Sequence, residues 1–388
     1  MNKIYATLTF ILISSSVQAL PLPVQTIKAY NCDRCVDLSH ELLQDKWSIA
    51  NKPLNFIVSN KQKSYGYRQE ITGQQLQTGI PLSFLAAGAV IRVSPINTSF
   101  SPALSLQTPN NKTMSLKEAS SLYSEDEPLE RNFSKESETI AQIKPELGKG
   151  RFILKSLTKE QNNSTYMINV LDKFSITHLD VETSSLYYHY GDTLKVKITL
   201  NDDDHDYDAD DIEALLVDPA GKMTPMDLKE LKANQFEATY VLNSELSDNG
   251  EHWYVKVNVE TEGNEGTIKR NGQTTFSYSI PSASLVQIKK TSSKPLTFSA
   301  TVEVATASRY SLQAILFKKN NDVFNALETA QTGTWLEPGI HSVEFTFDNS
   351  QQLADDSLYL GYLRLVDYGQ LKMIYHYDKP IKLSQLME

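Results

Sequence analysis

Residues 193–200 read TLKVKITL, and residues 253–259 read WYVKVNV. In both stretches an apolar side chain recurs at every second position. This period puts the recurring apolar side chains on one face of an extended chain, which is typical of a β-strand with one buried face. Antiparallel sheets of such strands bury their apolar faces against a second sheet, so these stretches predict a layered β domain.

Similar stretches occur on both sides of these two. The predicted strands are 176–181, 194–200, 212–217, 236–242, 253–259 and 276–280. Turn sequences such as Tyr190-Gly191-Asp192 and Asp218-Pro219-Ala220-Gly221 separate them. Short strands at this spacing predict a β-sandwich over residues 174–283.

The strand pattern starts again after Pro281. Residues 296–304 read LTFSATVEV, with an apolar side chain at every second position, and similar stretches follow up to residue 377. Residues 284–388 are therefore predicted to form a second β-sandwich.

Residues 20–173 have a different texture. Residues 36–47 have helical spacing of Leu38, Leu42 and Leu43, and shorter helices are expected at 115–123 and 134–143. Strands are expected at 89–93, 151–157 and 166–171, with the last two forming a hairpin. This mixture predicts an α+β N-terminal domain, so the whole chain is expected to be mainly β.

The N-terminus has the features of a secretory signal. Residues 4–13 read IYATLTFILI, and Val17-Gln18-Ala19 is a small-x-small cleavage sequence. We expect residues 1–19 to be removed after Ala19. The apolar run is too short to span a bilayer, and no later run is long enough. The mature chain is expected to be a monomer in the periplasm or outside the cell, with no membrane insertion.

Composition excludes some classes of partner. Lys and Arg number 37 against 47 Asp and Glu, which gives a formal net charge of -10. Nucleic acids and anionic membranes attract basic surfaces, so neither is expected as a primary partner. Apolar residues make up 40% of the chain, which is typical of a folded globular protein.

The chain has two cysteines, Cys32 and Cys35, in the sequence Asn-Cys-Asp-Arg-Cys. A structural disulfide fits an exported protein. A redox-active pair would need a βαβ pattern that the following sequence does not continue. A metal site would need two more ligands, and only His40 is close in sequence. We therefore predict a structural disulfide.

Residues 201–213, NDDDHDYDADDIE, form an acidic stretch between two predicted strands. Ca²⁺ takes six to eight oxygen ligands and would relieve the repulsion between these carboxylates. The candidate ligands are Asp202, Asp204, Asp206, Asp208, Asp210 and Glu213. Tyr207 stands where an EF-hand needs glycine, and strands flank the stretch, so we expect a Ca²⁺ site on a sandwich loop. The alternative is a solvated acidic loop without metal.

Several motifs carry a resemblance to known proteins. Residues 190–194 (YGDTL), 216–221 (LVDPAG), 236–240 (FEATY) and 250–255 (GEHWYV) are similar to a bacterial immunoglobulin-like (Ig-like) domain. With residues 88–95 (GAVIRVSP), the whole chain resembles a family of exported proteobacterial proteins of unknown function that includes secreted Legionella proteins. The resemblance implies an N-terminal domain followed by two tandem Ig-like domains, and release through type II secretion. It brings no catalytic residues.

These observations favour a binding protein over an enzyme. The chain contains no His-Glu-x-x-His and no Gly-x-Ser-x-Gly motif. We expect a secreted, adhesion-type protein that binds a protein or glycan ligand at a cell or host surface. One alternative is a secreted enzyme, or enzyme accessory, with its site in the N-terminal domain. Thiol–disulfide chemistry at Cys32 and Cys35 is another.

Overall fold

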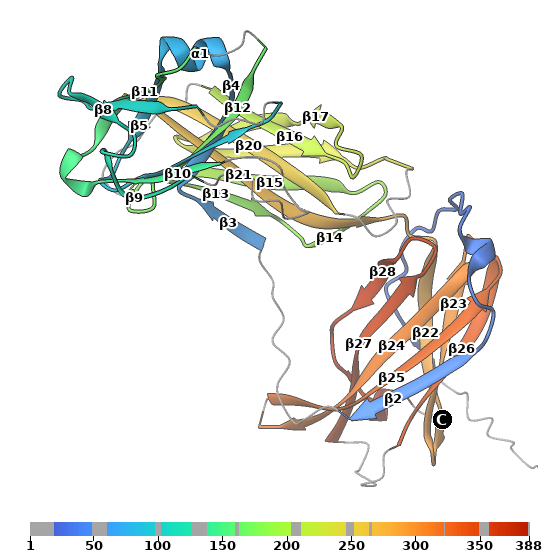
Figure 1. Ribbon diagram of the computed structural model, residues 1–388. Coiled ribbons are helices and arrows are strands. Elements are labelled where there is room, and N and C mark those ends of the chain that lie inside the picture. The colour runs from blue at the N-terminus through green and yellow to red at the C-terminus, as the bar shows by residue number, and fades with distance from the viewer. Residues whose placement is uncertain are drawn as a thin grey trace, which may run out of the picture. The chain divides into compact units, whose positions relative to one another are not determined.

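The structure is a computed structural model that describes residues 19–48, 60–97, 102–125, 138–159, 163–202, 211–245, 252–263, 266–321, 323–348 and 357–386. The chain forms two compact units. The inserted unit contains Ile57–Asn243 and Glu251–Ser277, and the terminal unit contains Met1–Phe56, Ser244–Gly250 and Tyr278–Glu388. Strands dominate both units (Figure 1), which confirms the prediction of a mainly β chain.

Two facing sheets form the first half of the inserted unit. One contains, in spatial order, β4 (Gly66–Thr72), β12 (Thr165–Leu171), β6 (Val90–Pro95), β10 (Thr139–Ile143) and β9 (Ser120–Glu125). The other contains β5 (Ile80–Phe84), β11 (Gly150–Ser156), β7 (Leu104–Gln107) and β8 (Thr113–Ser115). Side chains such as Ile91, Phe152 and Ile168 share one buried core between them.

The prediction of a mixed α+β N-terminal domain is wrong. Residues 120–125 and 139–143 form β9 and β10 instead of helices, because Thr139, Ala141 and Ile143 face the core with a period of two. Among the described residues, α1 (Gly73–Thr78) is the one α-helix, and a capping box between Thr72 and Gln75 starts it. No described helix has the length and apolar character needed to cross a membrane.

The second half of the inserted unit contains the six strands that alternation predicts, and all six are confirmed. They are β13 (His178–Thr183), β15 (Thr193–Asn201), β16 (Asp211–Val217), β19 (Gln235–Val241), β20 (Trp253–Gly263) and β21 (Gly266–Ser279). The strand order is β18-β19-β15-β13-β3 in one sheet and β14-β21-β20-β16-β17 in the other. The four added strands are β3 (Asn60–Ser64), β14 (Tyr187–His189), β17 (Met223–Pro225) and β18 (Asp227–Lys232).

The hairpin of β20 and β21 connects the two halves of this unit. Its strands pair from Trp253 and Phe276 to Gly263 and Gly266. Near the middle, Gly272 packs against Val181 of β13, since an added Cβ would lie 2.7 Å from that side chain. At the tip, an added Cβ on Gly266 would lie 3.2 Å from Ser83 Oγ of β5.

The terminal unit also consists of two sheets, with a main core and a smaller buried cluster of Ile315, Phe317 and Ala326. One sheet has the order β1 (Leu20–Pro21), β22 (Ala283–Ser293), β23 (Leu296–Val304) and β26 (Gly339–Phe347). The other has β2 (Leu43–Ser48), β25 (Val323–Leu336), β24 (Ser308–Asn320), β27 (Leu358–Asp367) and β28 (Lys372–Tyr377), and β29 (Ile381–Lys382) pairs with β27.

Residues 20–48, which the sequence placed with the N-terminal domain, pair with strands of the terminal unit. Leu20 is opposite Ile288, and β2 pairs with β25 along its whole length (Figure 1). The predicted helix over 36–47 is wrong: the segment has a short 3₁₀ turn at Cys35–Asp37 and then β2. Leu42 and Leu43 are 62% and 53% exposed, so no apolar surface covers the face that a helix would have buried.

Candidate functional site

The predicted calcium ligands border a gap in the described residues. Four of them lie outside the described residues: Asp204, Asp206, Asp208 and Asp210. Of the other two, Asp202 accepts a hydrogen bond from the Thr177 hydroxyl, and Glu213 accepts one of 2.7 Å from Asn258. Within the described parts of the chain, no three His, Cys, Asp or Glu side chains form a group suited to a metal ion. The calcium site therefore stays a prediction.

Cys32 and Cys35 form a disulfide in the terminal unit, with an S–S distance of 1.94 Å. The sulfur atoms lie against Gly369, where an added Cβ would come within 2.7 Å of both of them. Cys35 is 4% exposed, so one sulfur is closed to a thiol partner from solution. This packing supports a structural role for the disulfide.

Beside the disulfide lies a buried carboxylate, Asp367. It accepts hydrogen bonds from the Tyr30 hydroxyl (2.9 Å), the Ser282 hydroxyl (2.6 Å), the Ser308 hydroxyl (2.6 Å), the Gly369 backbone N–H (2.8 Å) and the Gln370 amide (3.0 Å). Burial, together with the charge of Asp367, raises the pKa of Tyr30, so this hydroxyl keeps its proton and remains a donor. The bond from Tyr30 to Asp367 attaches the N-terminal segment to β27, 337 residues later in the chain.

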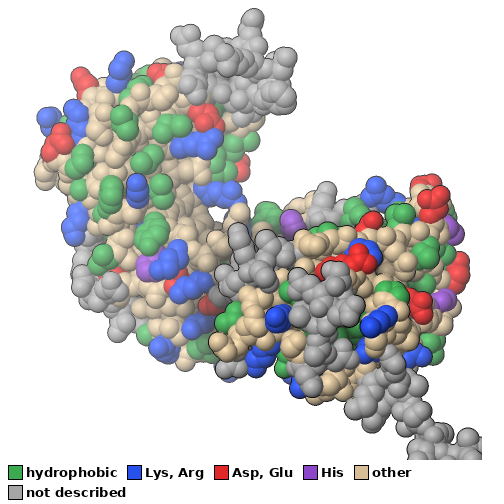
Figure 2. All heavy atoms as spheres, turned by 90° about the horizontal axis from the view of Figure 1, so that it is seen from below, with side chains coloured by type: hydrophobic (Ala, Val, Ile, Leu, Met, Phe, Trp, Pro, Cys, Tyr) green, Lys and Arg blue, Asp and Glu red, His purple; other side chains and the backbone are tan. Residues whose placement is uncertain are grey.

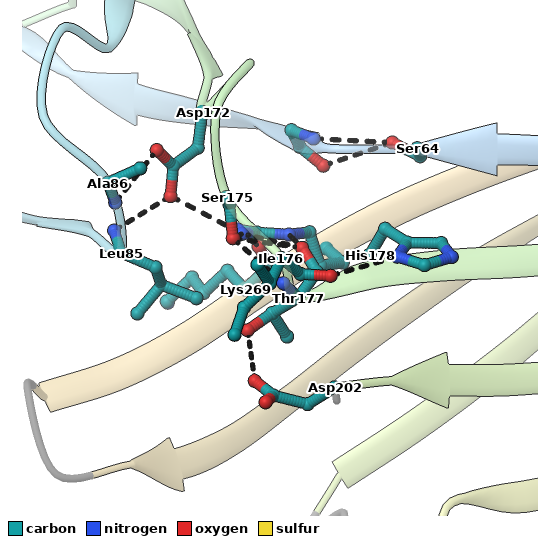
Figure 3. Close-up of polar contacts among 12 residues, drawn as sticks. Ser64, Leu85, Ala86, Asp172, Ser175, Ile176, Thr177, His178, Asp202 and Lys269 are labelled. Atoms are coloured by element: carbon teal, nitrogen blue, oxygen red, sulfur yellow. Dashed lines mark hydrogen bonds and ion pairs between the residues drawn. The ribbon is translucent and has the colours of Figure 1, made fainter. Parts of the chain in front are cut away.

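A second buried carboxylate, Asp172, lies at the border between the two halves of the inserted unit (Figure 3). It accepts hydrogen bonds from the backbone N–H groups of Leu85 (2.7 Å) and Ala86 (3.2 Å). Its third partner is Arg270 of β21, whose Nη2 lies 3.4 Å from Oδ2. Both charged side chains are 1% exposed, so this is a fully buried ion pair.

Arg270 also holds the short segment that joins the two halves. Its Nη2 donates to Ser175 Oγ (3.1 Å), and Nε and Nη2 both donate to the Thr177 carbonyl (3.2 Å each). Burial raises the pKa of Asp172 and lowers that of Arg270, while the attraction between the two charges opposes both shifts. The pair and its hydrogen bonds therefore fix the connection at residues 172–177.

Sequence reasoning missed this pair, although β21 carries a signal for it. Ile268, Gly272 and Thr274 face inward with a period of two, and Arg270 occupies an inward position in the same series. A charged side chain at a core position needs a buried partner of opposite charge. That partner, Asp172, is distant in sequence, so the local pattern does not reveal it.

A chain of hydrogen bonds crosses from the hairpin to β4. Asn258 donates to Glu213 (2.7 Å), and Asn271 donates to Asn258 (2.8 Å). The side-chain oxygen Oδ1 of Asn271 then accepts a hydrogen bond from the backbone N–H of Arg68. These hydrogen bonds position the outer face of the hairpin next to the outer face of the sheet that contains β4.

A groove of about 550 Å³ lies between these two faces, and we call it the junction groove. Its basic side chains are Lys63, Arg68, Arg92 and Lys256, and its amides are Gln62, Asn169, Asn271 and Gln273. No Asp or Glu occurs in this lining, all of which the structure describes. A neighbouring hollow shares Arg68, Lys256 and Asn271, and it also contains Asp211, Glu213 and Glu260.

Most of the basic side chains of the junction groove have no acidic partner among the residues that the structure describes. Arg92 is paired with Glu138, with Nε–Oε2 and Nη2–Oε1 distances of 3.0 and 2.5 Å. For Lys63, Arg68 and Lys256, no carboxylate of the described residues lies within ion-pair distance. On the face that Figure 2 draws, Lys and Arg side chains are interspersed with hydrophobic and with acidic ones.

Strand register arranges part of the groove floor in two rows. Arg68, Asn169, Arg92 and Ile140 are opposite one another across β4, β12, β6 and β10. The next row, two residues along the strands, contains Gly66, Leu171 and Val90. Ile140 at the end of the first row is 38% exposed, and Leu171 in the second row is 45% exposed. The row of Arg68 and Arg92 (the charged row) therefore lies beside the row of Leu171 (the apolar row), whose apolar surface is open to solvent.

Comparison with protein families covers almost all of the chain from residue 34 onward. Residues 34–172, 175–279 and 282–384 match the N-terminal, central and C-terminal domains of a family described as "domain of unknown function (DUF4785)". The chain belongs to the DUF4785 family. The border between the first two DUF4785 domains, at residues 172–175, coincides with the segment that Asp172 and Arg270 hold. The predicted resemblance to a family of unknown function is therefore confirmed.

A solved structure supports this assignment. A DUF4785 family protein (lpg0956) from Legionella pneumophila subsp. pneumophila str. Philadelphia 1 is 52% identical, with a TM-score of 0.84. The match covers 94% of this chain and 99% of that one. The adhesin domain of Epf from Streptococcus pyogenes is 11% identical over 55% of this chain and 77% of its own, and its TM-score of 0.16 carries no argument. No curated protein matches the chain.

Proposed function

We propose that this DUF4785 protein is an exported binding protein, with Ig-like central and C-terminal domains, that holds its ligand in the junction groove. The observation that carries the proposal is a hollow whose lining includes Lys63, Arg68 and Lys256, for which no described carboxylate lies within ion-pair distance, next to a buried ion pair. Fixed polar groups in a preformed hollow bind with little loss of conformational entropy. The ligand is a protein or a glycan at a cell or host surface.

The lining of the groove favours binding over catalysis. Its titratable side chains are Lys63, Arg68, Arg92, Lys256 and Tyr67, and burial raises the pKa of Tyr67. A general acid or base that works near neutral pH is most often a histidine or a carboxylate. The described lining contains neither, whereas its amide and cationic groups are well suited to hydrogen bonding.

Export is supported by two features of the N-terminal segment. The expected cleavage after Ala19 would leave Leu20, the first residue of β1, as the mature N-terminus. The nearby disulfide is typical of an oxidising compartment. N-terminal sequencing of protein from the periplasm and the culture medium should therefore begin at Leu20. Recovery of the chain only from the cytoplasm, with Met1 retained, would contradict export.

Binding is tested with the full mature chain on a random-peptide phage library and a glycan array. Leu171→Glu places a bulky acid on the floor of the groove and should abolish the enrichment that the unchanged protein gives. The matched control is Leu231→Glu on β18, because Leu231 is 50% exposed and lies outside the groove. If Leu171→Glu and Leu231→Glu bind the same probes as the unchanged protein, the groove is not the ligand site.

A further inference from the structure

We infer that the junction groove binds an acidic polypeptide segment in extended conformation, with a carboxylate and an aliphatic side chain two residues apart. This inference rests on the proposed function and specifies its ligand. It follows from the charge of the groove, the order of its rows and the kind of apolar surface that it presents.

The charge of the junction groove favours an anionic ligand. Lys63, Arg68 and Lys256 all line one hollow, and none of them has a carboxylate of the described residues within ion-pair distance, although the protein as a whole has a net charge of -10. Cations gathered in a groove attract an anionic group and determine its orientation. The amides of Asn169 and Gln273 lie beside them and can bond to the peptide backbone of a ligand.

The spacing of the two rows favours a ligand in extended conformation. Along β12, Asn169 in the charged row and Leu171 in the apolar row are two residues apart, which in a strand is roughly 6.8 Å. An extended ligand that runs along the strands repeats its own side chains on one face at the same roughly 6.8 Å. A Glu-x-Leu sequence would therefore place its carboxylate near Arg68 and its aliphatic side chain near Leu171.

The apolar surface favours a peptide over a glycan. The exposed apolar side chains of the groove are the aliphatic Ile140 and Leu171, and the half-buried Val90 lies beside Leu171. The one aromatic residue of the lining, Tyr67, is 6% exposed, so its ring offers no stacking surface to a sugar. Leucine or valine of a peptide would bury well against aliphatic side chains.

The experiment measures fluorescence anisotropy of labelled peptides with the full mature chain. The probe is Ser-Glu-Ser-Leu repeated three times, and the comparison peptides replace every Leu by Ser or every Glu by Lys. We expect the probe to bind more tightly than both. Replacing Lys63, Arg68 and Lys256 with Gln should weaken it about tenfold, since each exposed ion pair contributes roughly two- to threefold. Added salt should weaken it as well.

Two further variants separate the roles of charge and apolar contact. Lys195, Lys197 and Lys229, all exposed and outside the groove, replaced together with Gln change the net charge equally and should leave binding unchanged. Leu171→Ser should weaken the probe but leave the Leu-free peptide unaffected. Equal loss of both peptides in Leu171→Ser would overturn the Glu-x-Leu register.

The remaining outcomes also decide the question. Absence of binding of the acidic probe at millimolar concentration overturns the inference, and so does binding that the groove triple variant retains. Tighter binding of a polyglucuronate oligosaccharide than of the probe assigns the groove to acidic glycans and overturns the peptide ligand. In each case the proposed function is retained if Leu171→Glu abolishes binding of the probes that the phage library and the glycan array identify. That measurement does not assume a particular ligand chemistry, so it separates the two proposals.

Discussion

Asp172 in the inserted unit and Asp367 in the terminal unit are both buried carboxylates that connect distant parts of the chain, but different groups stabilise their charges. Asp172 has a cationic partner, Arg270, and two backbone N–H donors. The hydrogen bonds of Asp367 come from three hydroxyl groups, a backbone N–H and an amide. The inserted unit therefore depends on a charge pair, and the terminal unit on several neutral donors.

This difference predicts how each network fails. A buried ion pair that loses one member leaves an unpaired charge in a medium of low polarity, and the loss is large. A carboxylate with several neutral donors loses a fraction of its stabilisation when one donor is removed. Each network should also act on its own unit, so hydrogen exchange of peptides from each unit separates the two effects.

The largest effect is expected for Arg270→Met. This change leaves the Asp172 carboxylate buried without its cation and should lower the free energy of unfolding of the inserted unit by about 3–5 kcal/mol. Urea denaturation gives the magnitude, and hydrogen exchange should show the loss in residues 172–177 and in β21. Exchange in the terminal unit should not change.

The matched control combines Arg270→Met with Asp172→Asn. Removal of both charges leaves no unpaired ion, so the double variant should be more stable than Arg270→Met alone. A single variant as stable as the unchanged protein would show that the pair does not hold the two halves together.

Asp367→Asn should have the next largest effect, and it should fall on the terminal unit. In the Asn variant an NH₂ group replaces one of the two acceptor oxygens and meets the hydrogen-bond donors that surround it. The remaining hydrogen bonds also lose the contribution of the negative charge. We expect a decrease of about 2–3 kcal/mol in the free energy of unfolding, and about 1–2 kcal/mol for Tyr30→Phe, which removes one donor. Asp378→Asn is the control, because Asp378 is 44% exposed and makes one long ion pair with Arg364.

The central strands could be predicted from sequence because each of them has one buried face, and the apolar side chains of that face recur at every second position of the local sequence. Val255, Val257 and Val259 are buried and alternate with half-buried side chains. A period of two in the sequence therefore indicates burial of one face of the strand. The same reasoning failed for residues 36–47, where Leu42 and Leu43 remain exposed. The segment is a strand because β25 provides hydrogen-bond partners about 290 residues later. No local pattern contains that partner.

Pairing was harder to predict than the strands themselves. Residues 150–156 and 165–171 are both strands, but β11 pairs with β5 and β7 while β12 pairs with β4 and β6, so the predicted hairpin is wrong. The junction groove was missed for the same reason. Arg68, Asn169 and Lys256 become neighbours only through sheet register and through the contact between the two halves.

Removal of the disulfide should have a smaller effect than Arg270→Met or Asp367→Asn. Cys32→Ser combined with Cys35→Ser opens a very short loop, for which chain entropy gives about 2 kcal/mol. The decrease should be confined to the terminal unit, where the N-terminal segment keeps its bond from Tyr30 to Asp367. Mass spectrometry before and after reduction checks the bond itself. Insulin reduction at a rate comparable to that of a thioredoxin would contradict the structural role.

Calcium is expected to give the smallest effect, and it should act on the inserted unit, which contains Asp202–Glu213. Extracellular modules bind Ca²⁺ with dissociation constants of about 10⁻⁴–10⁻³ M. At about 1 mM Ca²⁺ and the tighter limit, linkage gives about 1.4 kcal/mol, or roughly 3–6 °C for a unit of this size. Mg²⁺ should do less, because it requires a smaller octahedron and loses water reluctantly.

The variants for this test replace Asp204, Asp206 and Asp208 with Asn, which should remove the Ca²⁺ response. Relief of repulsion between carboxylates should at the same time stabilise the metal-free protein. Asp33, Asp37 and Asp45 of the terminal unit, replaced together with Asn, change the charge equally and should leave the response intact. Calorimetry with and without Ca²⁺ gives the melting temperature, and hydrogen exchange assigns the shift to a unit. If the melting temperature does not change up to about 10 mM Ca²⁺, the acidic stretch is a solvated loop, because that concentration exceeds the dissociation constants of such sites.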